Sequence, residues 1–216
     1  MAPKSANKRT IVNAVEASSR RMPRMRMRGQ ISESVATVQG NELAATVEVT
    51  ATNTLGHGFV QLAPGNATGY TTSPIQNVGS QFQFGTYLPG TTIKYIPSCG
   101  INTLGSIYIA YTDSPQVMVQ YANLTAGQHL SFIKKFANIR TGPLWQELAF
   151  PILNKPRRSK FTNDSTLVSN DTNEVDLAVQ GMFFYLVTVP TAVTATTPYG
   201  HLVLHSKMRF SEVKQI

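Results

Sequence analysis

The pattern between residues 43 and 210 constrains the fold more than any other feature, because it predicts strands throughout and few helices. Segments rich in β-branched, aromatic or alternating apolar residues recur at roughly even spacing, separated by clusters of Gly, Pro, Asn and Thr. We therefore predict an all-β fold of eight antiparallel strands, a sandwich, barrel or jelly roll. The eight segments are Ala44–Ala51, His57–Leu62, Thr92–Ile96, Gly105–Tyr111, His129–Phe136, Glu147–Ile152, Val175–Val189 and Gly200–Phe210.

The segment Val175–Val189 is long, strongly apolar and without strict alternation. The run from Met182 to Tyr185 leaves no polar face, which is typical of a central strand covered on both sides. A buried helix is the alternative, and the β-branched and aromatic residues favour the strand. Residues 64–90 are expected to be mostly loop. Short helices are predicted only at Ser73–Val78, Pro115–Asn123 and Pro143–Gln146.

Positive charge is concentrated at the N-terminus. The first 28 residues hold eight basic residues and one acid, Glu16, so they carry +7 of the chain's formal net charge of +8. Pro23 and the alternating Met and Arg that follow favour an extended backbone, with arginines on one side and methionines on the other. We predict a partly disordered or extended basic arm over residues 1–40 and a body over 41–216. The basic residues are Lys4, Lys8, Arg9, Arg20, Arg21, Arg24, Arg26 and Arg28.

Such an arm on a near-neutral body is typical of a protein that binds a polyanion. The arm has no aromatic residues for stacking on bases, so it suits non-specific contact with phosphates. A disordered solvated tail is the alternative for residues 1–20. Charged residues make up only 14% of the chain, which suits a surface covered by other protein. A neutral β protein with Thr-rich strands explains the composition equally well.

The sequence carries no signature of an enzyme or of a required cofactor. It contains no GxSxG, Walker A, GxGxxG, HExxH or CxxC motif. The four histidines fall in or beside predicted strands and are interpreted as structural. Cys99 is also interpreted as structural, and because it is the one cysteine in the sequence, an intrachain disulfide is excluded. No stretch is apolar enough for a secretion signal or a membrane span, so no membrane partner is expected.

Two further charged segments follow in the second half. The basic run Lys155, Arg157, Arg158 and Lys160 is a candidate second nucleic-acid patch, or a partner for acids of its own or a neighbouring chain. A solvated loop is the alternative. The acidic cluster between Asp164 and Asp176 has ligands that suit calcium but no EF-hand spacing, and a solvated polar loop explains it better.

One segment resembles a known family. Ile93–Asp113 is similar to the shell-domain signature of coat proteins from small icosahedral plant RNA viruses of the tombusvirus and sobemovirus type. The stretch Gly142–Trp145 and the basic residues 155–160 also resemble the region after that family's sixth strand. The resemblance covers about residues 43–210. The matching residues are Tyr95, Pro97, Cys99, Thr103, Gly105 (one position late) and Asp113.

The resemblance implies an eight-stranded jelly roll that tiles an icosahedral shell, with the arm turned toward a single-stranded RNA genome. The partners would be many copies of the chain and viral RNA, in virions assembled in the host cytoplasm. Pro23–Gly29 lies where some members form an inter-subunit strand ring. Family calcium sites at subunit interfaces use carboxylates after the fifth strand; Asp113 matches one of them, and Gln116 stands where a second acid is expected. The alternatives are a monomeric RNA-binding β-domain, ribosomal or chaperone-like, and a β-sandwich lectin or enzyme.

Overall fold

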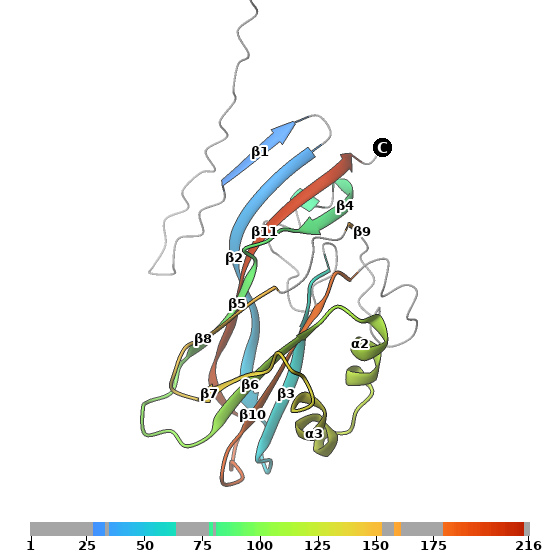
Figure 1. The fold of residues 1–216 in the computed structure, drawn as a ribbon. Helices are drawn as coiled ribbons and strands as arrows, with labels where there is room; N and C mark the ends of the chain where they lie inside the picture. The colour runs from blue at the N-terminus through green and yellow to red at the C-terminus, as the bar shows by residue number, and fades with distance from the viewer. Residues whose placement is uncertain are drawn as a thin grey trace, which may run out of the picture.

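A computed structural model describes residues 28–32, 35–63, 78–79, 81–152, 158–160 and 179–213 of the 216-residue chain. Most of these residues lie in antiparallel strands, with the helices between residues 115 and 133 on one side (Figure 1). The elements are β1 (Arg28–Ser32), β2 (Val35–Val49), β3 (Leu55–Gln61), β4 (Phe82–Tyr87), β5 (Thr92–Pro97), β6 (Ser106–Thr112), α2 (Pro115–Ala122), the 3₁₀ helix η1 (Ala126–Gln128), α3 (His129–Ile133), β7 (Arg140–Pro143), β8 (Leu148–Pro151), β9 (Ser159–Lys160), β10 (Met182–Thr188) and β11 (Thr197–Val213).

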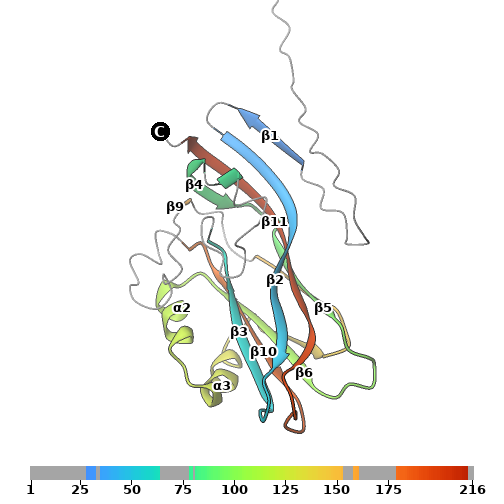
Figure 2. The same cartoon turned by 180° about the vertical axis from the view of Figure 1, so that it is seen from behind.

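The strands form two sheets that pack face to face (Figures 1 and 2). In the first sheet β1, β2 and β11 are neighbours; β11 then borders β5 through its first half and β4 through its second, with β8 beyond β5 and β9 beyond β4. The second sheet has the order β3-β10-β6-β7. The chain changes sheets between β2 and β3, β3 and β4, β5 and β6, β7 and β8, β9 and β10, and β10 and β11. Two four-stranded sheets, β2-β11-β5-β8 and β3-β10-β6-β7, joined in this way make the predicted jelly roll.

The main core lies between the two sheets. Alternate residues of each strand point inward, so Val47 and Leu202 of the first sheet meet Ile107 and Phe183 of the second, and all four are fully buried. Burying a side chain of this size contributes about 1.5–3 kcal/mol. Gln180 also links the sheets: its buried amide accepts a hydrogen bond from the Tyr87 N–H at 2.7 Å and donates to the Tyr87 carbonyl at 2.9 Å.

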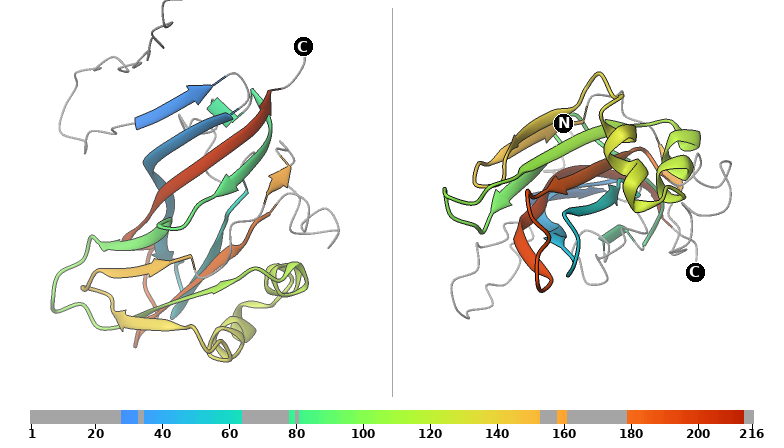
Figure 3. Two further views of the ribbon diagram at one scale, coloured as in Figure 1. Left: turned by 45° about the horizontal axis from the view of Figure 1, so that its top comes forward. Right: turned by 90° about the horizontal axis from the view of Figure 1, so that it is seen from below.

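A second core lies on the outer side of β10, under the helices. Tyr121 of α2 stacks on Phe184 of β10 with ring centroids 4.2 Å apart, and Met182, Leu186 and Ile133 are buried beside them. The helices α2 and α3 therefore cover β10 on the face turned away from the other sheet (Figure 3). Residues 182–187 are all buried, which confirms the prediction that this segment is a strand without a polar face.

One predicted strand is wrong. His129–Phe136 is helical over most of its length: η1 ends at Gln128 and α3 runs from His129 to Ile133. Thr125 starts the helical segment through a capping box, in which its own N–H donates to the Gln128 side chain at 3.0 Å. His129 and Ile133, four residues apart, then face the second core. The strand that occupies this place in the jelly roll is β7.

Other boundaries also differ from the predictions. The predicted helix Pro143–Gln146 is a turn closed by the Gln146 N–H on the Pro143 carbonyl, because the chain must switch sheets there. Strand β4 lies within residues 64–90, which were expected to be loop. Of the predicted helix Ser73–Val78, only Val78 is among the described residues, and it is helical. Strand β2 is continuous across residue 40, while the division into arm and body stays a prediction.

Candidate functional site

The described residues of the basic arm are 28–32, which form the edge strand β1, and 35–40, which begin β2. Arg28 pairs with Gln39 and Ser32 with Val35, so β1 and β2 make a hairpin at the edge of the first sheet. This pairing fixes the point from which the preceding residues leave the body. The other basic residues predicted to bind RNA lie outside the described residues: Lys4, Lys8, Arg9, Arg20, Arg21, Arg24 and Arg26.

The second basic patch is described only in part. Lys155 and Arg157 lie outside the described residues, and Lys160 pairs with Phe84 through the short strand β9. Arg158 forms an ion pair with Glu212, with both side chains about half exposed, and its guanidinium lies 3.7 Å from the centre of the Phe84 ring. An exposed pair of this kind contributes little stability. Arg158 therefore has a partner within its own chain, and the role of the patch in binding RNA stays a prediction.

Asp113 is exposed at the end of β6, just before α2. The part of the chain that the structure describes holds no group of three or more His, Cys, Asp or Glu side chains that fits a metal ion. Calcium takes six to eight oxygen ligands, so Asp113 would need further oxygens from backbone or side-chain carbonyls, from waters or from a neighbouring subunit. Calcium at a subunit interface remains a prediction.

The histidines lie in or beside structural elements, two of them against each other. His57 of β3 stacks on His129 of α3 with ring centroids 3.7 Å apart, and the Tyr121 ring meets His129 edge-on at 4.7 Å. Burial lowers the pKa of His57, and the adjacent His129 lowers it further. On the first sheet, His205 hydrogen-bonds to Asn41. None of these contacts brings a nucleophile to a general base.

The segment that carries the sequence resemblance ties two loops together. The Tyr95 hydroxyl lies 2.7 Å from the Leu144 carbonyl and 2.9 Å from the Tyr199 carbonyl, and the Cys99 thiol lies 3.2 Å from the same Leu144 oxygen. Gly105 has a φ of +135°, and a Cβ there would meet the Thr188 carbonyl at 2.5 Å. Glycine is therefore required where the β5–β6 loop approaches the body. These residues position the two loops through packing and hydrogen bonds, and we assign them no chemical role.

The two joined loops expose large apolar side chains, a feature that the sequence analysis did not identify. Leu104 is 73% exposed and Trp145 is 42% exposed, and the hydrogen bond from the Leu144 N–H to the Gly105 carbonyl holds their loops together. Ile101, in the same loop as Leu104, is 76% exposed. We call Ile101, Leu104 and Trp145 the apolar corner. Exposed apolar groups that share one region mark a protein contact more often than scattered ones.

No helix among the described residues is long and apolar enough to cross a membrane. The sequence matches no protein-family model and no curated protein.

Solved structures of viruses have the same fold. The chain is 19% identical to the protein of melon necrotic spot virus, with a TM-score of 0.68, over all of this chain and 61% of that one. It is 13% identical to that of mud crab tombus-like virus, with a TM-score of 0.66, over 92% of this chain and 96% of that one. It is 14% identical to that of the semi-empty virus-like particle of Macrobrachium rosenbergii nodavirus from giant freshwater prawn, with a TM-score of 0.62, over 99% and 96%.

At such identities the likeness concerns the fold. It agrees with the resemblance in Ile93–Asp113, and the matched proteins are viral capsid proteins. The fold of this chain is therefore the jelly-roll shell domain of capsid proteins from small icosahedral viruses.

Proposed function

We propose that the chain is the coat subunit of an icosahedral virion, which self-assembles in the host cytoplasm and packages single-stranded RNA through its basic arm. The observation that carries the proposal is the jelly roll itself, because it matches proteins of assembled virus particles over nearly the whole chain. The subunit does no chemistry on a substrate. Its work is to bury surface against other copies and to neutralise phosphates.

The surface features support this division of work. The apolar corner offers hydrophobic area for a contact between copies, since Ile101 and Leu104 are about three-quarters exposed. The arm leaves the body at β1, on the edge of the first sheet, and carries +7 of the net charge. If all seven charges meet phosphates, the logarithm of RNA affinity falls with the logarithm of salt concentration with a slope of about −5.

The test compares the full chain with a variant that lacks residues 1–27. Electron microscopy of the purified full chain is expected to show uniform closed shells that contain RNA. Without residues 1–27 the body keeps β1, so it is expected to fold and to lose most of the packaged RNA. Only monomers or dimers across a range of salt and pH would contradict the shell-forming role. An unchanged RNA content after the deletion would contradict the role of the arm.

A further inference from the structure

The described basic residues differ in whether their charge already has a partner. The Arg140 guanidinium donates to the Ala149 carbonyl at 2.6 Å, the Lys134 ammonium lies 5.8 Å from the Tyr108 ring, and Arg158 pairs with Glu212. In contrast, Lys207 and Arg209 of β11 have no side-chain hydrogen bond or ion pair in the part of the chain that the structure describes. Both side chains are exposed. Two free cations therefore stand two residues apart, on the same face of one strand.

This face adjoins the strand that carries the end of the arm. Lys207 pairs with Gln39 of β2, and Gln39 pairs with Arg28 of β1, so the three residues form one row across the sheet. Arg209 pairs with Thr37 on β2 and with Thr86 on β4. Directly paired residues share a face, so Gln39 flanks Lys207, and Thr37 and Thr86 flank Arg209.

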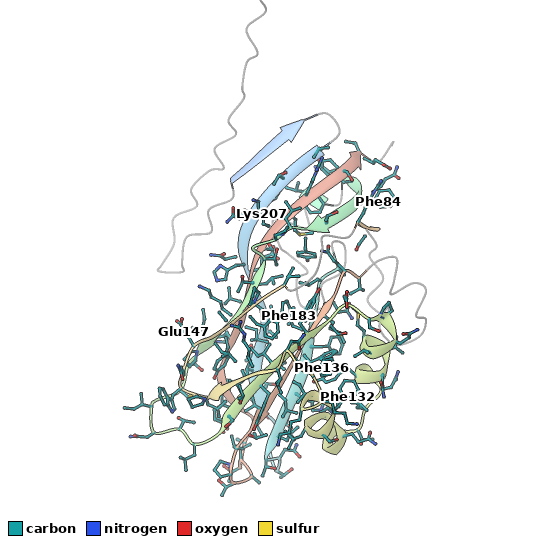
Figure 4. The ribbon with its side chains drawn as sticks, viewed as in Figure 1. Phe84, Phe132, Phe136, Glu147, Phe183 and Lys207 are labelled. Atoms are coloured by element: carbon teal, nitrogen blue, oxygen red, sulfur yellow. The ribbon has the colours of Figure 1, made fainter. Side chains whose placement is uncertain are left out.

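Charge changes sign along the same face. Lys94 and His205 lie next to the Lys207 end, whereas Glu48 pairs with Pro198 near the start of β11. Glu147, also exposed, precedes β8 at that other end, and Figure 4 shows it well away from Lys207. Glu212, three residues beyond Arg209, is already paired with Arg158. The part of the face beside β1 is therefore basic.

We propose that Lys207 and Arg209 form a second phosphate-binding surface, which continues the basic arm across the outer face of the first sheet. The inference rests on the proposed function and adds where the body itself touches the RNA. Thr37, Gln39 and Thr86, which pair with Lys207 or Arg209, can donate hydrogen bonds to phosphate oxygens. The Phe84 ring, on the same face of β4, already lies against the Arg158 guanidinium. Lysine supplies a point charge and arginine a bidentate donor, both suited to phosphates.

The test uses two double variants of the full chain that lose the same charge. Lys207→Gln with Arg209→Gln removes the free cations of β11. Lys134→Gln with Lys135→Gln removes two exposed cations at the end of α3, on the helical side. The probe is a single-stranded oligouridylate, titrated at several salt concentrations and at protein concentrations below those at which shells form. The first variant is expected to flatten the salt slope by about 1.4, and the second to leave it unchanged.

Three outcomes would overturn the inference. Equal losses in both variants would mean that net charge alone matters. A wild-type slope in the Lys207 and Arg209 variant would show that RNA does not touch this face. Wild-type RNA binding combined with failure to form shells would assign the face to a contact between subunits.

Two controls keep the result interpretable. Arg209→Lys alone keeps the charge and is expected to keep the slope, and a circular dichroism melt checks that each variant folds. The proposed function fails separately, when the unmodified chain forms no shells and binds no RNA.

Discussion

The central strands of the two sheets, β10 and β11, differ in what covers their outer faces. Strand β10 is buried on both faces, because α2 and α3 pack Tyr121 and Ile133 against Phe184 and Leu186. Strand β11 alternates between buried residues and partly or fully exposed ones, and Lys207 is exposed. The described part of the chain thus covers the outer face of the second sheet and leaves that of the first sheet open.

Because of this difference, we expect one outer face to contribute to the stability of the fold and the other to contribute to binding. The covered face is apolar and filled, so substitutions there act on folding. The open face carries titratable and charged side chains with few partners, so substitutions there act on contacts outside the subunit. Figure 4 shows the same division, with Phe132 and Phe136 packed on the helical side and Lys207 on the opposite sheet.

The largest expected effect comes from truncating the same residue type on the two faces. Leu186→Ala removes a fully buried side chain beneath the helices and is expected to lower the free energy of unfolding by about 2–5 kcal/mol. Leu43→Ala, 58% exposed on the open sheet, is expected to change it by less than about 0.5 kcal/mol. Urea unfolding of both variants measures the difference. Similar losses in the two variants would mean that the open face is packed in the subunit after all.

A smaller effect is expected from pH on the covered side. The folded pKa of His57 lies below the ordinary value because burial and the stacked His129 disfavour its charged form. The unfolded histidine takes up a proton near pH 6.5, so below that pH the unfolded chain binds more protons than the folded one. The contribution to stability is complete above about pH 6.5 and is lost as the pH falls through the folded pKa. Tyr121, which also faces the pair, stays neutral because burial raises its pKa.

The measurement compares the urea midpoint at pH 7 and pH 5 in the wild-type chain and in His57→Gln. The variant removes the titrating ring, which is only partly buried, and is expected to show a smaller drop in midpoint on acidification. Other groups, such as carboxylates, titrate equally in both proteins and cancel. An identical drop in the two proteins would refute a role for the stacked pair in acid sensitivity.

Much of the jelly roll could be predicted from the sequence, because most strands alternate or carry β-branched residues over five or more positions. The apolar run within Val175–Val189 even indicated that β10 is covered on both faces. The exception, His129–Phe136, contains enough apolar and aromatic residues for either structure. Its helix is decided by the cap at Thr125 and by the packing of His129 and Ile133 on β10, which local pattern does not reveal.

The surfaces were harder to predict than the fold. The charge of the arm is a property of composition and is visible at once, whereas the apolar corner depends on two loops that are brought together by contacts distant in sequence, such as the Gly105–Leu144 hydrogen bond. That Lys207 and Arg209 have no ion pair among the described residues likewise depends on which acids lie near them in space. Sequence reasoning singled out Arg158 instead, and that residue proves to be paired with Glu212, 54 positions away in the chain.

The smallest expected effect concerns the pKa of a histidine on the open face of the first sheet. Partial burial lowers the pKa of His205, and the positive charge of Lys94 lowers it further. Lys94→Gln removes only the second cause, so the pKa of His205 is expected to rise part of the way toward its ordinary value. Imidazole proton shifts followed by NMR across pH 5–8 measure this change, with His57 on the other sheet as an internal control. If His205 does not move, or if His57 moves equally, Lys94 does not act locally, and the basic character of this face would have to come from charges elsewhere in the molecule.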